Sequence, residues 1–368
     1  MARTVSRGEA RDRGGLVAVA VFVAASILLI ALLASRQGPK APAPGFPPAQ
    51  AVPVSVTGLA RLTGAGTIGW LLPVPLSGPR DVAVTSAGTV WITEQDKGAV
   101  DAFLGGKLLR YEVDAKFPSS GAFALSSGPT DSMWFTGYPN GNIGRMLPDG
   151  TVNSFSAVAD TSETVAAAQA LDGSMWVTDV NLGVVIRIDT QGRVAAFAVP
   201  PPTSVQERVG PYDIARAADG MLWFTDPRTR SLGTIAAGGG TPTIREYRVT
   251  DGSDPRSIAA GPDGTMWVTF PKAGIGRVDG PGSVRTYPVP AAPDPINNIA
   301  LAKDGSIWLT TAGRTILHVR PDGSLIRRFT LPGGAVGADG ISIAPDGTVW
   351  AAATDANMLV EIPNHSSG

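Results

Sequence analysis

Seven tryptophans recur at a nearly constant interval along the chain, and this spacing restricts the possible folds more than any other feature. They lie 43, 42, 47, 44, 41 and 42 residues apart, at Trp91, Trp134, Trp176, Trp223, Trp267, Trp308 and Trp350. A repeat of about 40 to 50 residues is typical of a β-propeller, because one small sheet cannot bury both of its faces and must stack on neighbours around an axis. We expect the seven indole rings to pack between adjacent sheets.

One repeat, residues 254–290, shows how a single blade is built. Asp263-Gly264 supplies a tight turn between two runs in which apolar and polar residues alternate, as in a β-hairpin. Two further runs follow at 273–278 and 283–289, and the last stops at prolines, which cannot continue a strand ladder. Each repeat is therefore predicted to be a four-stranded antiparallel sheet, and the chain an all-β, seven-bladed β-propeller.

The last repeat contains only three predicted strands, near residue 340 and at 348–353 and 357–362. The segment 67–75 instead matches the fourth strand of the other repeats. We predict that this N-terminal strand completes the last blade, because closing the ring in this way removes two open sheet edges. The propeller is predicted at 63–363, followed by a short tail at 364–368.

The segment before the propeller is predicted to anchor the protein in a membrane. Residues 16–34 carry no charge, and as a helix they would span roughly 28 Å, close to the thickness of a bilayer's hydrocarbon core. Four arginines precede them, so the positive-inside rule predicts a cytoplasmic tail at 1–14, a transmembrane signal anchor at 15–35 and an extracytoplasmic propeller. A cleaved signal peptide is the alternative, although its apolar core would be unusually long. The proline-rich stretch 36–62 is predicted to be a semi-rigid stalk.

Composition excludes several functional classes. The formal charge is −1, with 30 basic and 31 acidic residues, so no electrostatic feature predicts nucleic-acid binding. The chain has no cysteine, which excludes disulfides, a thiol nucleophile, a thiolate metal site and a lipidated cysteine.

Motifs repeated between the blades resemble those of the streptogramin lyase (virginiamycin B lyase) family, over about residues 67–362. The likeness rests on Gly78-Pro79-Arg80, on Trp134-Phe135-Thr136 with Asn142-Ile143-Gly144-Arg145, and on Asp254-Pro255-Arg256. The resemblance implies an elimination that opens a cyclic depsipeptide ester. It also implies a His base at the start of a blade's first strand, two flanking Glu residues and a Mg²⁺ ion nearby. These are scaffold motifs, so the activity has to be argued from the site itself.

The positions equivalent to the family's base lie eleven residues before each Trp. They are occupied by Arg80, Phe123, Val165, Tyr212, Arg256, Asn297 and Asp339, so none is His. The positions three residues after each Trp are Glu94, Gly137, Asp179, Asp226, Phe270, Thr311 and Ala353. An arginine cannot act as the base, because its guanidinium group stays protonated. Of the two histidines, His318 is predicted on a third strand away from the channel mouth, and His365 lies in the tail.

Two functions remain open from the sequence. The first is a non-enzymatic binding or scaffold propeller without a required cofactor, which takes a small polar ligand, glycan or peptide at the channel mouth. Its candidate residues form a mixed-charge ring of Arg80, Glu94, Glu163, Asp179, Tyr212, Asp226, Arg256, Asn297 and Asp339. The same residues could equally be turn residues and salt bridges between blades.

The second function is a metal-dependent C–O lyase with a rearranged site. Glu163, Asp179 and Asp226 would then hold Mg²⁺ through oxygen ligands, and Tyr212 would exchange a hydrogen bond with the substrate.

Overall fold

The computed structural model describes residues 49–50, 53–113, 121–128, 131–138, 141–156, 159, 161–203, 207–238, 240–249 and 253–364. The predicted tail at 1–14, the signal anchor at 15–35, the first part of the stalk and residues 365–368 lie outside these ranges. Within the described ranges, no helix is both long and apolar enough to cross a membrane.

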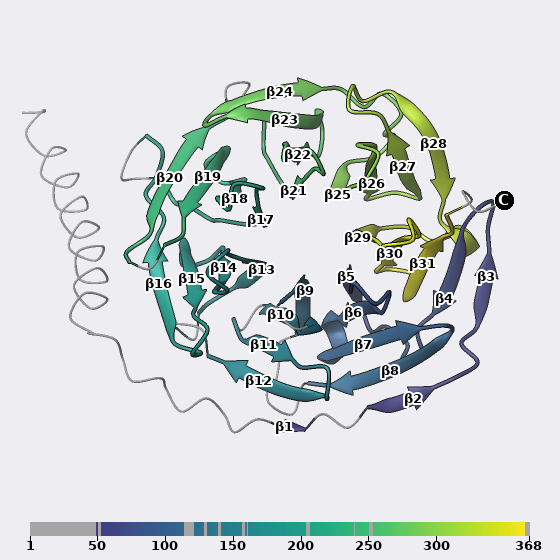
Figure 1. Ribbon diagram of the computed structural model, residues 1–368. Coiled ribbons are helices and arrows are strands. Elements are labelled where there is room, and N and C mark those ends of the chain that lie inside the picture. Colours follow the sequence, from purple (N-terminus) through teal and green to yellow (C-terminus); the bar gives the residue numbers. More distant parts are fainter. Residues whose placement is uncertain are drawn as a thin grey trace, which may run out of the picture. The chain divides into compact units, whose positions relative to one another are not determined.

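The chain forms seven antiparallel sheets that follow one another around a central axis, as predicted (Figure 1). The innermost strands, β5, β9, β13, β17, β21, β25 and β29, surround that axis. Blade 1 holds β5 (Pro79–Val84), β6 (Val90–Glu94), β7 (Ala99–Leu104) and β8 (Lys107–Glu112). Blade 2 holds β9 (Gly121–Ser127), β10 (Met133–Tyr138), β11 (Ile143–Met146) and β12 (Thr151–Phe155). Blade 3 holds β13 (Thr164–Gln169), β14 (Met175–Asp179), β15 (Val184–Ile188) and β16 (Val194–Ala198).

The remaining blades repeat this order from the axis outwards. Blade 4 holds β17 (Ile214–Arg216), β18 (Leu222–Asp226), β19 (Ser231–Ala236) and β20 (Thr243–Arg248). Blade 5 holds β21 (Ile258–Ala260), β22 (Met266–Phe270), β23 (Gly274–Gly280) and β24 (Ser283–Tyr287). Blade 6 holds β25 (Ile296–Leu301), β26 (Ile307–Thr311), β27 (Thr315–Val319) and β28 (Leu325–Thr330). Blade 7 holds β29 (Ala338–Ile343), β30 (Val349–Ala353) and β31 (Met358–Ile362). Two short 3₁₀ turns are η1 (Gln95–Lys97) and η4 (Pro332–Gly334).

The N-terminal strand β4 (Ile68–Leu71) completes blade 7, which confirms the predicted closure of the ring. It pairs antiparallel with β31, and Ile68 lies opposite Glu361. The indole Nε1 of Trp70 also donates a hydrogen bond to Glu361 Oε2 at 2.9 Å. Residues almost 300 positions apart in the sequence are therefore joined, so the fold depends on both ends of the described chain.

The stalk is predicted to extend to residue 62, but its described residues, 49–50 and 53–62, do not form a free spacer. The prediction is wrong for these residues. Strand β3 (Arg61–Thr63) adds to β4 in blade 7, β2 (Val54–Val56) adds to β8 in blade 1, and β1 (Ala49–Gln50) adds to β12 in blade 2. Three blades thus have five strands, and the propeller begins before the predicted residue 63. Proline is tolerated at such edges, because an edge strand uses its N–H groups on one side only.

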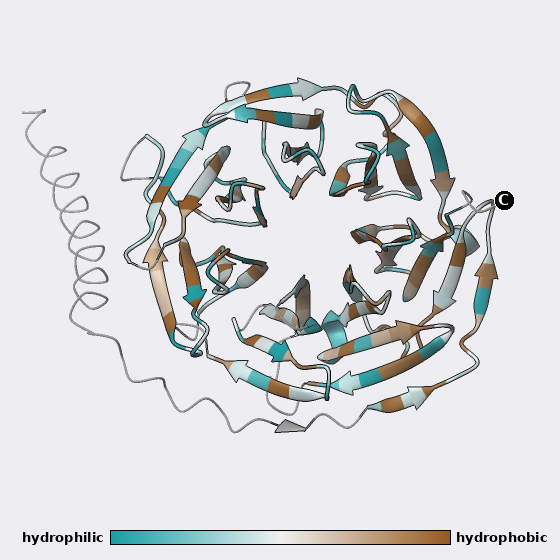
Figure 2. Ribbon diagram, viewed as in Figure 1, coloured by the Kyte–Doolittle hydropathy of each residue, from teal (hydrophilic) through white to brown (hydrophobic). Residues whose placement is uncertain are grey.

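The core of the ring consists of apolar clusters between successive sheets, and the seven tryptophans belong to these clusters, as predicted. Trp134 of blade 2, for example, packs with Met175, Val177 and Ile186 of blade 3. Trp350 of blade 7 packs with Val90 of blade 1 and so continues the pattern across the closure. Figure 2 shows both apolar and polar residues along the blade strands. The second strands β6, β14 and β22 are buried at every position, as expected for sheets that pack both faces against neighbours.

Candidate functional site

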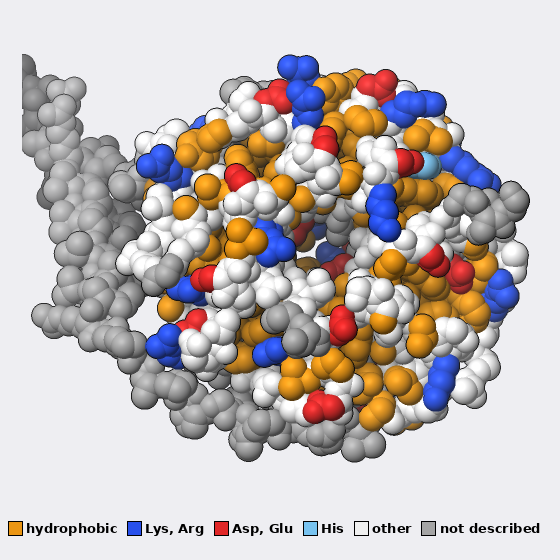
Figure 3. Space-filling view, viewed as in Figure 1, with side chains coloured by type: hydrophobic (Ala, Val, Ile, Leu, Met, Phe, Trp, Pro, Cys, Tyr) orange, Lys and Arg blue, Asp and Glu red, His pale blue; other side chains and the backbone are white. Residues whose placement is uncertain are grey.

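In every blade, the residue eleven positions before the Trp lines one shared pocket at the central axis. Arg80, Phe123, Val165, Tyr212, Arg256, Asn297 and Asp339 all line this cavity, which has a volume of about 80 Å³. The space-filling view shows the ring hollowed at its centre (Figure 3). We call these seven residues the rim. The prediction that equivalent positions from all blades gather at the axis is therefore confirmed for them.

A second ring of side chains, which the sequence analysis did not single out, lines the same pocket. It consists of the residues that directly follow the rim, and we call it the floor: Asp81, Ala124, Ala166, Asp213, Ser257, Asn298 and Gly340. Successive residues of a regular strand point to opposite faces. In five blades, however, the ladder shifts register at this pair of positions. A bulge of this kind redirects side chains, so that both residues reach the channel.

A buried threonine lies two residues after each of six tryptophans, and five of these threonines donate a hydrogen bond to a rim residue of the next blade. In blade 4, Thr225 Oγ1 accepts the backbone N–H of Asp213 at 3.1 Å and donates to the carbonyl oxygen of Arg256, in blade 5, at 2.7 Å. Thr93, Thr136 and Thr310 bridge their own blade to the next in the same way. Each such hydroxyl therefore fixes a rim residue of the neighbouring blade.

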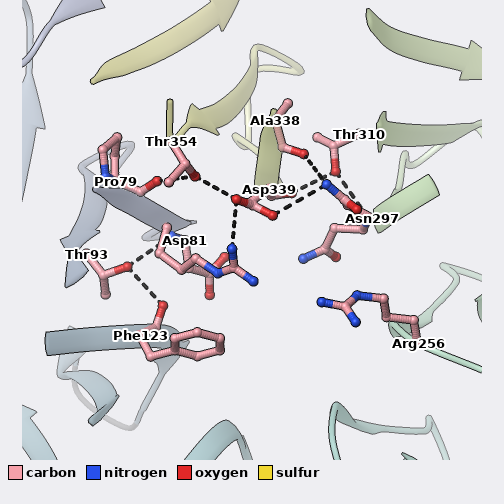
Figure 4. A network of polar contacts seen from close by, with 12 residues as sticks. Pro79, Asp81, Thr93, Phe123, Arg256, Asn297, Thr310, Ala338, Asp339 and Thr354 are labelled. Atoms are coloured by element: carbon pink, nitrogen blue, oxygen red, sulfur yellow. Dashed lines mark hydrogen bonds and ion pairs between the residues drawn. The ribbon is translucent and has the colours of Figure 1, made fainter. Parts of the chain in front are cut away.

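Arg80 and Asp339 form the charged junction between blades 1 and 7, and Figure 4 shows Asp339 among its polar neighbours Thr354 and Asn297. Arg80 Nη1 lies 2.9 Å from Asp339 Oδ2, and both side chains are largely shielded from solvent. Thr354 Oγ1 lies 2.6 Å from the same carboxylate oxygen. Asn297 Nδ2 donates to the carbonyl oxygen of Ala338 at 3.0 Å. These contacts hold the polar groups of blades 6, 7 and 1 in fixed positions around the pocket.

Arg256 and Tyr212 form the opposite side of the rim. Arg256 Nη2 donates to the phenolic oxygen of Tyr212 at 2.9 Å, and the guanidinium carbon lies 4.7 Å from the centre of the Tyr212 ring. Arg80 makes a similar cation–π contact with Phe123, at 4.8 Å. In the described part of the chain, no carboxylate lies within salt-bridge distance of Arg256. Its positive charge therefore faces the pocket without an ion pair in direct contact, and Asp213 is the carboxyl group nearby.

The floor carries two carboxyl groups with perturbed acidity. Burial raises the pKa of Asp81 to about 7, and the nearby charge of Asp213 adds to this shift. Burial likewise raises the pKa of Asp213. Asp81 is packed closely against blade 7, because a Cβ atom at Gly340 would lie 2.2 Å from Asp81 Oδ1. Only glycine fits at that position of the floor.

Four of the predicted ring residues, Glu94, Glu163, Asp179 and Asp226, lie outside the pocket lining. Glu94 is fully buried and forms an ion pair with Arg110 of the same blade. Asp179 Oδ1 accepts the backbone N–H groups of Glu163, Asn181 and Leu182. Asp226 accepts those of Gly210, Arg228 and Thr229. Asp179 and Asp226 therefore cap turns, as the alternative interpretation of the ring expected, whereas Glu94 neutralises a buried arginine of its own blade rather than bridging two blades.

The predicted metal ligands Glu163, Asp179 and Asp226 are not brought together. The carboxylates of Asp179 and Asp226 each accept backbone N–H groups from the loop that follows them and from the segment before the first strand of the same blade. The half-buried Glu163 is absent from the pocket lining. Across the described residues, no group of three or more His, Asp or Glu side chains is arranged to hold a metal ion. The donor set therefore does not fit a shared Mg²⁺ ion.

His318 lies on β27, the third strand of blade 6, away from the rim as predicted. Its ring stacks on Trp308 with the centroids 4.2 Å apart, and its Nε2 lies 2.7 Å from Ser306 Oγ. Burial lowers the pKa of His318. His318 is thus a packing residue between strands, and His365 lies outside the described residues.

Comparison with known proteins gives a consistent result. The model of the virginiamycin B lyase family matches residues 70–362. A virginiamycin B lyase of Nocardia farcinica is 29% identical over 230 residues, which is 62% of this chain and 76% of that protein. A streptogramin B lyase structure superposes with a TM-score of 0.72 at 23% identity, covering 82% of this chain and 97% of the other. A catalytically inactive histidine-to-alanine variant of virginiamycin B lyase from Staphylococcus aureus, with quinupristin, gives 0.70 at 23% identity over 80% and 98%.

Proposed function

Because the chain belongs to the virginiamycin B lyase family, we propose that it is a binding member of that family, which receives a small polar ligand, glycan or peptide at the mouth of its channel. The observation that supports this most is the convergence of all seven equivalent positions on one pocket. The rim of that pocket presents two guanidinium groups, a phenol, an amide and a carboxylate, a set suited to orienting a polar ligand.

The residue types at the rim favour binding over the family's elimination. Elimination next to a carbonyl needs a base with a pKa near the working pH, and histidine is the usual choice. No rim position is His, and Arg80 and Arg256 stay protonated at any ordinary pH. The rim therefore supplies charge and hydrogen bonds without an imidazole base.

The proposal is tested by thermal unfolding of the full-length chain with a panel of sugars, sugar acids and short peptides. A ligand that binds the folded state raises the midpoint as its concentration increases. We expect at least one compound to stabilise the wild type and Arg285→Gln, a control in the same blade whose side chain is 61% exposed, but not Arg256→Gln. Equal stabilisation of all three proteins would contradict binding at the rim.

A lyase with a rearranged site is the second candidate, and Asp81 is the observation that favours it. Its raised pKa of about 7 is that of an effective general base, and it lines the pocket. The test is to follow a streptogramin B antibiotic by chromatography, with and without Mg²⁺. Ring opening that Asp81→Asn abolishes would establish this candidate and displace the first.

We also propose that residues 15–35 anchor the protein in a membrane with the propeller on the outer side. The support is the uncharged run at 16–34 and the arginines before it. Release of the full-length chain from membranes by alkaline carbonate would contradict the anchor. Protection of the propeller from protease added to intact cells would contradict the orientation.

A further inference from the structure

The floor of the pocket contains a continuous hydrogen-bonded chain across blades 4, 5 and 6. Ser257 Oγ lies 2.8 Å from Asp213 Oδ2 and 2.7 Å from Asn298 Oδ1. The backbone N–H of Ile299 donates to Asn298 Oδ1 at 2.8 Å, which identifies that atom as the carbonyl oxygen of the amide. Ser257 therefore stands between two acceptor atoms.

A serine hydroxyl has one proton and cannot donate to both neighbours. Both contacts are attractive at once when Ser257 donates to Asn298 and a protonated Asp213 donates to Ser257. Asp213 also accepts the backbone N–H of Ile214 on Oδ1 at 2.9 Å and that of Ile258 on Oδ2 at 2.8 Å, which favours its ionised form. The raised pKa of Asp213, caused by its burial, agrees with this arrangement. Burial thus favours the protonated form of Asp213, while the two backbone N–H groups and the charge of Arg256 oppose it.

Asp81 is the second acid of the floor. Its Oδ1 accepts the N–H of Val82 at 2.9 Å and its Oδ2 accepts that of Leu125 at 2.8 Å. Its carboxyl group exchanges a proton near neutral pH, because burial and the charge of Asp213 oppose ionisation while Arg80 favours it. The charge of the floor therefore changes within the ordinary pH range.

The other charged or titratable groups of the pocket come from four blades. Arg80 and Asp339 are paired with each other, Arg256 faces Asp213, and Tyr212 receives a hydrogen bond from Arg256. Strands β9, β13 and β25 contribute only uncharged side chains to the lining. When both floor acids are protonated, the unpaired charge of Arg256 leaves the pocket with a net charge of +1.

From this arrangement we infer that the pocket binds the carboxylate group of a small monoanionic ligand on Arg256, and that binding is coupled to protonation of Asp81 in the floor. The inference rests on the proposed binding function and specifies the group that is recognised. A guanidinium group matches a carboxylate with two parallel hydrogen bonds, and a single unpaired arginine matches a single negative charge. A protonated floor removes the like charge that would repel the ligand.

Fluoroacetate is a suitable probe, because it stays anionic throughout the neutral range and its ¹⁹F resonance broadens on binding. Fluoroacetamide is its uncharged counterpart. We expect the full-length chain and Arg285→Gln to bind fluoroacetate but not fluoroacetamide, and Arg256→Gln to bind neither. Equal binding of the two probes, or binding unchanged in Arg256→Gln, would overturn the assignment of a carboxylate site.

The proton coupling is tested by repeating the titration at several pH values. If only the form with a protonated Asp81 binds, the apparent affinity of the wild type should fall roughly tenfold between about pH 6 and about pH 8. In Asp81→Asn, which cannot ionise at this position, we expect binding to persist and the pH dependence to disappear. A flat profile in the wild type, or the same slope in Asp81→Asn, would overturn the coupling.

The outcomes separate this inference from the proposed function. If an uncharged sugar or peptide stabilises the wild type in an Arg256-dependent way while fluoroacetate does not bind, the binding function stands and the carboxylate site is wrong. If no compound of the panel gives an Arg256-dependent shift and fluoroacetate does not bind, both are wrong.

Discussion

Replacing Thr225 by valine should weaken the junction between blades 4 and 5 while leaving the shape of the side chain almost unchanged. The hydroxyl accepts the N–H of Asp213 and donates to the carbonyl oxygen of Arg256, and Thr225 itself is fully buried. Thr225→Val leaves one backbone donor and one backbone acceptor without these partners. Each buried unsatisfied group costs about 1 to 3 kcal/mol, so for the two groups we expect a loss of about 2 to 6 kcal/mol in the free energy of unfolding.

The assay is urea denaturation followed by tryptophan fluorescence, with Thr243→Val as the matched control. Thr243 lies on β20 of the same blade and is exposed, so its replacement should change the unfolding free energy by less than about 0.5 kcal/mol. If Thr225→Val and Thr243→Val unfold at the same urea concentration, the hydroxyl does not hold the rim and the reasoning is refuted.

Three further predictions concern the stability of the blades. Gly233→Ala should destabilise the protein by about 1 to 3 kcal/mol, because its Cβ would lie 1.9 Å from the Phe224 ring; adding Phe224→Leu should recover part of the loss in urea denaturation. Arg110→Met should cost about 3 to 5 kcal/mol, because it leaves the buried Glu94 and Asp101 without their cation; an unchanged melting temperature would contradict this. Burial, followed by the charge of Asp226, raises the pKa of Glu246 from 4.5 to about 9, so its stabilising contribution is complete below 4.5 and is lost as the pH rises towards 9. Glu246→Gln should therefore raise the urea midpoint at pH 8 more than at pH 4.5, and the opposite order would contradict the burial argument.

The ring and the rim could be predicted because they repeat. A tryptophan every 41 to 47 residues fixes the register of each blade, and a constant offset from it then locates Arg80, Arg256 and Asp339 at the axis. The closure by β4 could be predicted because the last repeat lacks a strand that 67–75 supplies. A periodic pattern carries this information without any knowledge of side-chain contacts.

The floor could not be predicted in the same way, because strand periodicity places Asp81 and Asp213 on the face opposite to the rim. In blade 1 a register shift near the rim position, between Pro79 and Val82, brings Asp81 into the channel. The sequence does contain a signal for the floor, because a polar residue such as Ser257 or Asn298 stands ten positions before several of the tryptophans.

The predicted ring of site residues also included side chains that accept hydrogen bonds from backbone N–H groups and do not line the pocket. Asp179 and Asp226 end a second strand and accept N–H groups two and three residues further on, as turn-capping aspartates do. A carboxylate at the end of a strand has the same sequence signature whether it caps a turn or faces a ligand. The short strands β1 and β2 were likewise hidden by the prolines around them.

Site-specific protection of a single cysteine tests most directly whether the channel mouth receives a ligand. The chain has no cysteine of its own, so Ala124→Cys places the only thiol in the lining of the pocket without altering a charged group. A compound that raises the unfolding midpoint should slow methanethiosulfonate labelling of Ala124→Cys and leave the labelling of Thr243→Cys unchanged. If such a compound leaves the labelling rate of Ala124→Cys unchanged, the ligand binds elsewhere and the central claim is wrong.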